Sequence, residues 1–394
     1  MHKLISANGD CKDVDRNLKT KTIILILLIL PMVLSAQIDS LKSKLNFEGD
    51  FRFRVEQDWN SKKSDGTFRD NRTRFRYRLR AGILYKDKWY STGFRIRTGN
   101  PIKQQDPQLT LGDGFKEYGT LPVGLEKVYF QGEWNTFKFW VGKNTFPFEK
   151  SNELFWSDNV YPEGITFEKG FRFSSTVIDL LEIKGGHYII SSSGKSLSQD
   201  TYFQGYQINA KFLENRFELF PAFYLFKNVP NIPDGNETFE IDYAIFHLGN
   251  RLKIMRTPLL IMEFDFYKNL QSYSQNDSIP TNFKQQKSGV VIGLKYGSLK
   301  QKGDWLFKAS YANLQQYSAV DFMAQNDWAR WDYSSFGSPD GRLTNFNGIE
   351  LVAGFMVDKK VSLKMKYYVV KQLIAYGRTK ETGNRIRLDL DVKF

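Results

Sequence analysis

From residue 45 onward, apolar and polar side chains alternate along the chain in repeated segments. Within residues 45–56, the odd positions hold Leu, Phe, Gly and Val, while the even positions hold Asn, Glu, Asp and Arg. The segment 72–83 is more regular still, because an arginine stands at every even position from Arg72 to Arg80, between Thr, Phe, Tyr, Leu and Ala. A period of two is typical of a β-strand with two unlike faces. At helical spacing these arginines would surround the whole cylinder, so the pattern excludes a helix.

The same alternation recurs to residue 394 in runs of about 9–13 residues, the length of a tilted strand that crosses a bilayer. It is clearest in residues 90–97, 127–134, 260–266, 361–367 and 385–394. These segments are predicted to be membrane-spanning strands.

Short and long polar connections alternate between the predicted strands. Short turns are expected near Asp87, Asn135, Ser174, Asn215, Arg251, Lys300 and Asp358. Long connections cover residues 60–70, 100–123, 144–162, 192–200, 227–237, 269–285, 315–345 and 371–382. This order predicts an up-and-down antiparallel meander of about 16 strands, with both ends of the sheet on the side of the short turns.

The arginines of segment 72–83 distinguish a soluble sheet from a membrane barrel. Five guanidiniums cannot line a dry core without partners, and the opposite face would expose a long apolar stripe to water. Turning the arginines toward lipid would cost roughly 2–4 kcal/mol for each one near the bilayer midplane. Aromatic residues beside the short turns suit a girdle at the membrane interface: Tyr85, Trp89, Trp134, Phe137 and Trp305. We therefore predict an all-β transmembrane barrel with an aqueous lumen.

The N-terminal segment is typical of a secretory signal peptide. Lys19 and Lys21 precede an apolar run that begins at Ile23, and small residues stand before Gln37. A membrane anchor is the alternative, but the run is shorter than the roughly 20 residues that a spanning helix needs. We expect residues 1–36 to be a signal peptide with an extended leader and residues 37–394 to form the barrel domain. Cleavage after Ala36 would leave 358 residues with a net charge of +11 instead of +13, and without the single cysteine.

Composition narrows the classes of function. A hydrophobic fraction of 41% and a mean hydropathy of −0.45 exclude a bundle of apolar membrane helices. Only His187 and His247 remain after cleavage, which leaves little room for a metal site or for acid–base catalysis. Asp242 lies five residues from His247, so the two occupy opposite faces of a strand. We predict no enzyme, no cofactor and no metal, and no nucleic-acid partner, because the cations alternate behind an apolar face.

Residues 385–394, in which apolar positions alternate and end in Phe394, resemble the signal that the barrel-assembly machinery recognises in Gram-negative outer-membrane porins. Residues 141–148, 154–156 and 161–164 are similar to porin families related to phosphate-selective and alginate-export barrels. The resemblance implies a location in the outer membrane, with outer-membrane lipid, lipopolysaccharide and the assembly machinery as partners. It leaves open an association of three copies.

A barrel of about 16 strands is too wide for side chains to fill, so we expect a water-filled channel. Strands begin near Leu45, which leaves no room for a plug domain after the expected cleavage. Closing the meander places the last strand beside the first and forms a basic wall, with Glu48, Asp50, Asp389 and Asp391 interspersed. The predicted pore-lining cations are Arg52, Arg54, Arg72, Arg74, Arg76, Arg78, Arg80, Arg95, Arg97, Lys364, Lys366, Arg385 and Arg387. The opposite wall is predicted to carry Glu240, Asp242, Glu263 and Asp265.

The third long loop, residues 144–162, carries Glu149, Glu153 and Asp158. In sixteen-stranded general porins the third loop folds inward and faces a basic wall, and the position and charge of this loop are similar. We expect it to form an acidic constriction; a surface turn is the alternative. Charges at a constriction select ions by sign and orient dipolar solutes.

Two functions follow from this picture. One is passive diffusion of small hydrophilic solutes with a preference for anions. The other is a channel dedicated to an anionic solute such as phosphate, a uronate or an acidic oligosaccharide. A barrel whose long loops bind a partner is a third alternative.

Overall fold

The computed structural model describes residues 44–102, 104–105, 107–112, 121–174, 177–231, 239–328 and 343–394, and the expected signal peptide lies outside these residues. One antiparallel sheet contains every strand. Its strands are β1 (Leu45–Trp59), β2 (Arg72–Lys86), β3 (Tyr90–Thr98), β4 (Leu109–Thr110), β5 (Val123–Trp134), β6 (Phe137–Lys143), β7 (Glu163–Arg172), β8 (Ile178–Ser191), β9 (Thr201–Phe212), β10 (Phe217–Pro230), β11 (Glu240–Arg256), β12 (Leu259–Asn269), β13 (Ser288–Gly297), β14 (Trp305–Leu314), β15 (Phe346–Asp358), β16 (Val361–Gln372) and β17 (Thr382–Lys393). A single turn of 3₁₀-helix, η1, covers Asp321–Met323. Within the described residues, no helix has the length and hydropathy needed to cross a membrane.

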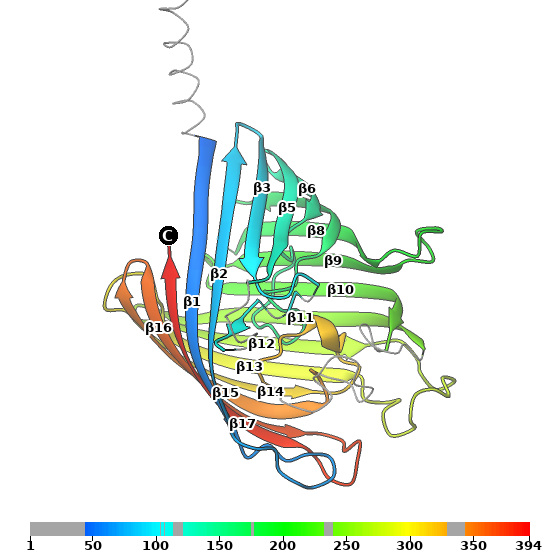
Figure 1. The fold of residues 1–394 in the computed structure, drawn as a ribbon. Coiled ribbons are helices and arrows are strands. Elements are labelled where there is room, and N and C mark those ends of the chain that lie inside the picture. The colour runs from blue at the N-terminus through cyan, green and yellow to red at the C-terminus, as the bar shows by residue number, and fades with distance from the viewer. Residues whose placement is uncertain are drawn as a thin grey trace, which may run out of the picture.

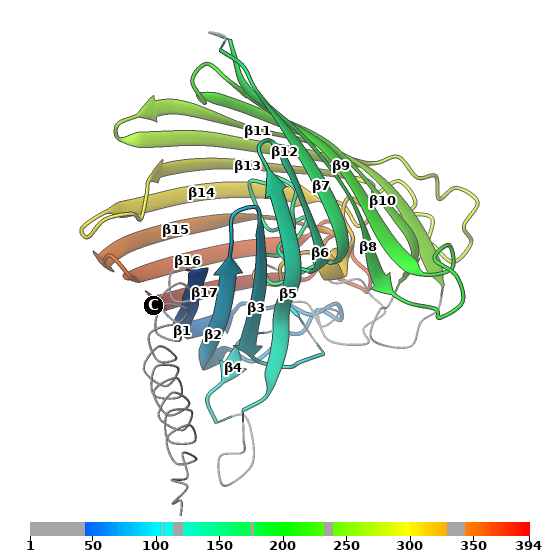
Figure 2. The same cartoon turned by 90° about the horizontal axis from the view of Figure 1, so that it is seen from above.

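The sheet closes on itself. Strand β1 pairs with β2 on one side and with β17 on the other, and each remaining long strand pairs with its neighbours in the chain. Figures 1 and 2 show the closure, with blue β1 beside red β17. The two-residue β4 pairs only with the long-loop end of β2, at Arg76 and Tyr77. The predicted barrel of about 16 strands is therefore confirmed, with β4 as an addition at its rim.

The order of short turns and long loops is also as predicted, with one correction. The turn expected near Arg251 is wrong: β11 continues to Arg256, and the turn consists of Thr257 and Pro258. A polar residue occurs at position 251, within the strand, because its guanidinium faces the lumen, where Arg251 pairs with Glu218 on β10 at 2.8 Å. A polar residue in the middle of a strand marks a wet lumen here, and not a turn.

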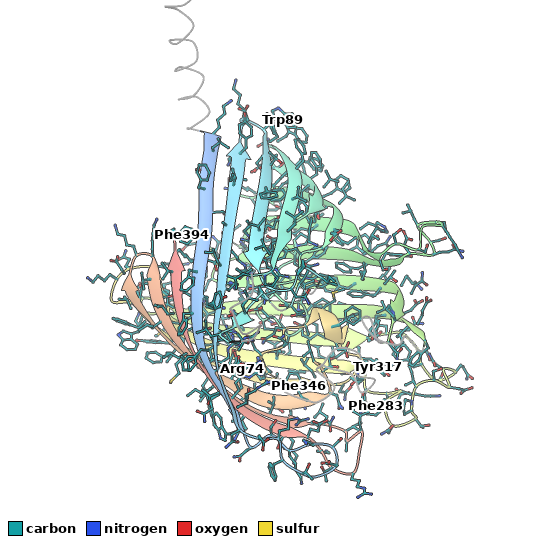
Figure 3. The ribbon with its side chains drawn as sticks, in the orientation of Figure 1. Arg74, Trp89, Phe283, Tyr317, Phe346 and Phe394 are labelled. Atoms are coloured by element: carbon teal, nitrogen blue, oxygen red, sulfur yellow. The ribbon has the colours of Figure 1, made fainter. Side chains whose placement is uncertain are left out.

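The outer face of the barrel is apolar and exposed, as a lipid-facing surface must be. Phe75, Leu79 and Ile83 on β2 are each more than 40% exposed. The aromatic residues predicted beside the short turns form stacked contacts on this face, for example between the rings of Trp89 and Trp134, whose centroids are 4.8 Å apart. Trp89 marks the short-turn end in Figure 3, and Phe283 and Tyr317 lie toward the long-loop end.

The interior differs between two sides of the barrel. Strands β16, β17, β1, β2 and β3 turn charged side chains inward, and we call this side the charged wall. Strands β8 to β12 turn large apolar side chains inward, among them Phe203, Tyr224, Phe226 and Ile245, and we call this side the aromatic wall. Loop 144–162 enters the barrel and packs its apolar side chains on the aromatic wall.

Candidate functional site: the barrel lumen

Cross-strand ion pairs organise the charged wall at the seam where the barrel closes. Arg54 on β1 donates to both carboxylate oxygens of Asp389 on β17, at 2.5 and 2.9 Å, and both side chains are almost fully buried. Arg52 binds Asp391 in the same two-fold manner, at 2.5 and 3.1 Å. The sheet register dictates these pairs, because each arginine lies directly opposite its aspartate.

The arginine ladder on β2 has partners along its length. Arg74 pairs with Glu56 and Arg78 pairs with Asp50 on the neighbouring β1. Arg80 reaches Glu126 on β5 at 2.9 Å, and Arg76 donates to the carbonyl oxygen of Gln108 at 3.0 Å. Interleaved carboxylates therefore relieve the repulsion between these five like charges.

The remaining predicted cations also lie on the lumen face and have acceptors. Arg385 binds Asp58 at 2.8 Å, Arg95 binds Glu126 at 2.6 Å, and Lys364 binds Asp391 at 3.0 Å. The others are Arg72 with Asp58 at 3.6 Å, Arg97 with the carbonyl oxygens of Thr98 and Asn100, Lys366 with Glu350 at 3.8 Å, and Arg387 with Asp327. The structure thus places all thirteen predicted cations on one continuous wall.

Loop 144–162 folds into the barrel and packs on the aromatic wall. Its side chains Phe148, Leu154, Phe155 and Trp156 are each at most 3% exposed. The Trp156 ring lies between loop and wall, with centroids 4.5 Å from Phe146 and 5.1 Å from Phe203. Burying a large aromatic side chain in this way stabilises the docked loop by roughly 1.5–3 kcal/mol.

A glycine on β9 makes room for the loop. A Cβ atom placed on Gly205 would lie 2.4 Å from the Phe148 ring. That ring has little freedom to shift, because Tyr188, Phe203 and Tyr224 surround it with centroid distances of 5.5 to 6.3 Å. Gly205 therefore permits the close approach between loop and wall.

Polar contacts fix the backbone of the loop at both walls. The amide N–H of Glu149 donates to the Gln207 side chain at 2.7 Å, and that side chain donates back to the Glu149 carbonyl at 3.0 Å. Asn152 donates to Asp265 on β12 at 2.8 Å. On the charged wall, Arg80 donates to Asn159 at 2.8 Å and Arg95 donates to the Tyr161 hydroxyl at 2.7 Å. The loop therefore spans the lumen from one wall to the other.

The three acidic residues of the loop have different environments. Glu149 lies against Lys184 at 3.8 Å and Arg251 at 3.2 Å. Burial opposes its ionisation, but these two cations outweigh burial and hold the pKa of Glu149 below its ordinary value. Asp158 pairs with Lys150 of the same loop. Burial and the charge of Asp158 raise the pKa of Glu153 above its ordinary value.

The predicted opposite wall is only half right. Glu263 and Asp265 on β12 face the lumen, where Glu263 binds Lys308 at 3.0 Å. The placement of Glu240 and Asp242 on this wall is wrong, because the alternate residues of β11 are the buried ones. Asp242 instead pairs with Lys227, at the long-loop end of the outward face. The lumen face of this part of β11 is apolar, so the rule that charged positions face inward fails there.

The alternating sequence pattern does not reveal the aromatic wall or the buried histidine within it. His247 is 1% exposed, its Nε2 lies 2.8 Å from Asp265, and its ring stacks on Tyr267 with a centroid distance of 4.6 Å. Asp265 therefore links His247 to Asn152 of the loop. The available signal was the run from Leu219 to Phe226 on β10, where both faces are apolar.

A cavity of about 460 Å³, large enough for several water molecules, remains between loop 144–162 and strands β12 to β16. Glu149, Glu153 and Asp158 line it on the loop side. Four lysines line it on the strand side together with Glu263 and Glu350, namely Lys295, Lys308, Lys364 and Lys366, and Lys150 lies on the loop side. Lys295 and Lys308 were missed, although each stands at the lumen position of an alternating strand and the two face each other in register.

No group of three or more His, Cys, Asp or Glu side chains that could hold a metal ion occurs in the part of the chain that the structure describes. The lumen combines charged surfaces with space for water, and both features are typical of a channel.

Comparisons with known proteins point to the same class. Residues 66–244 match the model of a family described as "Putative porin". The fold is similar to that of OprB from Pseudomonas putida, with a TM-score of 0.55, 13% sequence identity, and coverage of 91% of this chain and 96% of that chain. It is also similar to OmpF from Salmonella typhi, solved in complex with daunomycin, with a TM-score of 0.53, 11% identity, and coverage of 89% and 97%. No curated protein matches the sequence.

The closed barrel has the porin fold, and the match to the porin family model covers residues 66–244 of the chain. The resemblance to outer-membrane porins that the sequence carries is confirmed.

Proposed function

We propose that this barrel is an outer-membrane channel for the passive diffusion of small hydrophilic solutes, with a preference for anions. The charge of the lumen carries the proposal. On strands β16, β17, β1, β2 and β3, the thirteen predicted cations face six lumen-side carboxylates: Glu48, Asp50, Glu56, Asp58, Asp389 and Asp391. Glu126, Glu350 and Asp327 also pair with this wall, and the thirteen cations still exceed these nine carboxylates. An excess of fixed cations on a lumen wall raises the local concentration of anions, and Lys364 and Lys366 of this wall line the cavity.

The two sides of the cavity differ in net charge, because the loop side carries three carboxylates and Lys150, whereas the strand side carries four lysines with Glu263 and Glu350. Such an arrangement produces a field across the path and favours solutes that orient in it. The arginines of β2 donate to carboxylates or carbonyl groups of the wall, so their guanidinium N–H groups are already occupied and are not arranged to bind a solute oxyanion. This favours general diffusion over a channel dedicated to phosphate, a uronate or an acidic oligosaccharide.

Lys295 allows a clean test. Among the described residues it forms no ion pair, so Lys295→Gln removes a cavity charge without stranding a carboxylate. We expect the reversal potential in a potassium chloride gradient to move toward cations, because the local anion concentration falls. Lys302→Gln, an exposed change in the β13–β14 turn, is the matched control and should leave the potential unchanged.

An unchanged reversal potential in a folded Lys295→Gln barrel would contradict anion preference at this cavity. Block of the chloride current by millimolar phosphate or glucuronate would instead support the dedicated channel. Export by cleavage of residues 1–36, assembly through Phe394 and association of three copies remain predictions. We place the short turns on the periplasmic side.

A further inference from the structure

The lipid-facing surface of β13 to β16 is hollowed by a cavity of about 530 Å³ whose lining is almost entirely apolar. The sheet register explains its shape. Ala309 on β14 and Ala353 on β15 occupy adjacent rows, opposite Leu351 and Phe307 respectively. These two small side chains form the floor, and large side chains form the rim, namely Leu294, Tyr296, Phe307, Leu351, Met365 and Tyr367.

A second cavity of about 760 Å³ lies at the short-turn end of the same surface. It shares Tyr296 and Phe307 with the apolar cavity, so the two cavities adjoin each other. Residues 256–259 and 296–305 line most of it, including Arg256, Lys300 and the indole of Trp305. An apolar groove thus leads to a polar end with two cations and an interfacial tryptophan.

Both cations at the polar end are available to a ligand. Lys300 is exposed and forms no ion pair with any residue that the structure describes. Arg256 pairs with Glu214 at 3.0 Å, but both side chains are more than half exposed, and such pairs are weak. Asp304 also lines the cavity, and its carboxylate is engaged by the backbone N–H groups of Lys300 and Gln301 at 2.9 Å each. Asp304 therefore shapes the turn and leaves the two cations facing outward.

We propose that the two cavities form one binding site for a glycerophospholipid of the surrounding leaflet. The phosphate lies at Arg256 and Lys300, and an acyl chain lies over Ala309 and Ala353. The dimensions suit this ligand, because Ala309 is four residues from Trp305 along β14, about 13 Å at the rise of a strand. That distance places the apolar floor at the depth of acyl chains when Trp305 is at the interface. The paired cations favour an anionic lipid over a second apolar barrel surface.

Native mass spectrometry of the purified barrel in detergent, titrated with dioleoyl phosphatidylglycerol, tests the site. Removing both charges in Arg256→Gln/Lys300→Gln should weaken the tightest binding event about 25-fold, since each cation near a lipid surface contributes about fivefold. Filling the floor in Ala309→Leu/Ala353→Leu should remove that event while leaving the charges in place. The matched controls are Lys88→Gln/Arg172→Gln in other short turns and Ala81→Leu on the outer face of β2, and both should bind as the wild type does.

Dioleoylglycerol, which has the same chains and no phosphate, separates the two parts of the site. It should bind the wild type more weakly than phosphatidylglycerol and should be insensitive to the Arg256→Gln/Lys300→Gln change. Equal loss of phosphatidylglycerol in the controls, or binding unchanged in both groove and charge variants, would overturn the proposal. So would a groove variant that changes the number of barrels per particle and leaves lipid binding intact, because the groove would then be an interface between copies.

Discussion

The two walls of the lumen bury their inward-facing side chains in opposite ways, one through ion pairs and the other through ring contacts. The charged wall buries guanidiniums and carboxylates against each other, as in the contact between Arg54 and Asp389. The aromatic wall buries rings against a loop, as in the contact between Phe155 and Tyr267, whose centroids are 5.2 Å apart. Loop 144–162 packs its apolar side chains on the second wall and reaches Arg80 and Arg95 of the first. The cavity that remains lies along β12 to β16, where Lys364 and Lys366 of the charged wall line it.

The largest effect is expected when an ion pair of the charged wall is removed at the seam between β1 and β17. Asp389→Ala leaves Arg54 buried without its two-fold acceptor and also weakens Arg52, whose nearest atoms lie 3.9 Å from Asp389. Losing one partner of a buried pair typically costs about 3–5 kcal/mol. We expect a lower urea midpoint, measured by the heat-modifiable band on electrophoresis.

Glu48→Gln is the control for the seam, because Glu48 is 55% exposed and lies 3.8 Å from Arg95. Its urea midpoint should stay close to that of the wild type. If the Asp389→Ala barrel unfolded at the same urea concentration as the wild type, the ion pairs at the seam would contribute nothing to closure of the barrel.

The next test loosens the aromatic wall. Trp156→Ala removes the ring that contacts Phe146 and Phe203, and the indole N–H that donates to the Val160 carbonyl at 2.9 Å. Truncating a buried tryptophan typically costs about 3–5 kcal/mol, here divided between the docked loop and the barrel as a whole. Single-channel conductance should rise and become noisy, since the loop would leave the wall for part of the time.

Trp134→Ala, on the outer face, is the matched control for the loss of an indole and should leave conductance unaltered. A Trp156→Ala channel with wild-type conductance would mean that loop 144–162 does not narrow the path.

The smallest effect expected is that of pH on the junction between the walls. Lys184 and Arg251 hold the pKa of Glu149 below 4.5, so ionised Glu149 stabilises the docked loop above that pH. This contribution is lost as pH falls through the depressed pKa of the folded state. Conductance noise should therefore increase only below about pH 4.

The Glu149→Gln channel should lack this acid-induced increase and should show the same noise at pH 7 and at about pH 3, where the wild type becomes noisier. Wild-type noise that begins near pH 6 would assign the titration to another group.

The contrast also explains what the sequence could and could not predict. The strands of the charged wall can be recognised in the sequence because water on one face and lipid on the other impose a period of two, as in residues 72–83. On β10 both faces are apolar, since Phe220 and Tyr224 pack on the inside while Phe223 and Leu225 alternate with them on the outer face, so the period disappears. The docking of Phe148 on Gly205 joins positions 57 residues apart and depends on shape, which no local pattern encodes. Lys364 and Lys366 were predicted to line the pore, whereas Lys295 and Lys308 were not, because only the folded loop decides which part of the lumen stays open.

The seam between β1 and β17 has a consequence for the time course of folding. Its partners, such as Arg54 and Asp389, are 335 residues apart, whereas every other pair of long neighbouring strands is adjacent in the chain. The entropy of closing so long a segment favours forming the hairpins first and the seam late, which gives a high contact order and slow folding. Until the seam forms, β1 and β17 are both open edges that can pair with another chain. Figure 3 shows Phe394 beside β1, and a Cβ atom on Gly49 would lie 2.2 Å from its ring. This contact joins the two ends of the sheet and therefore forms only when the seam closes.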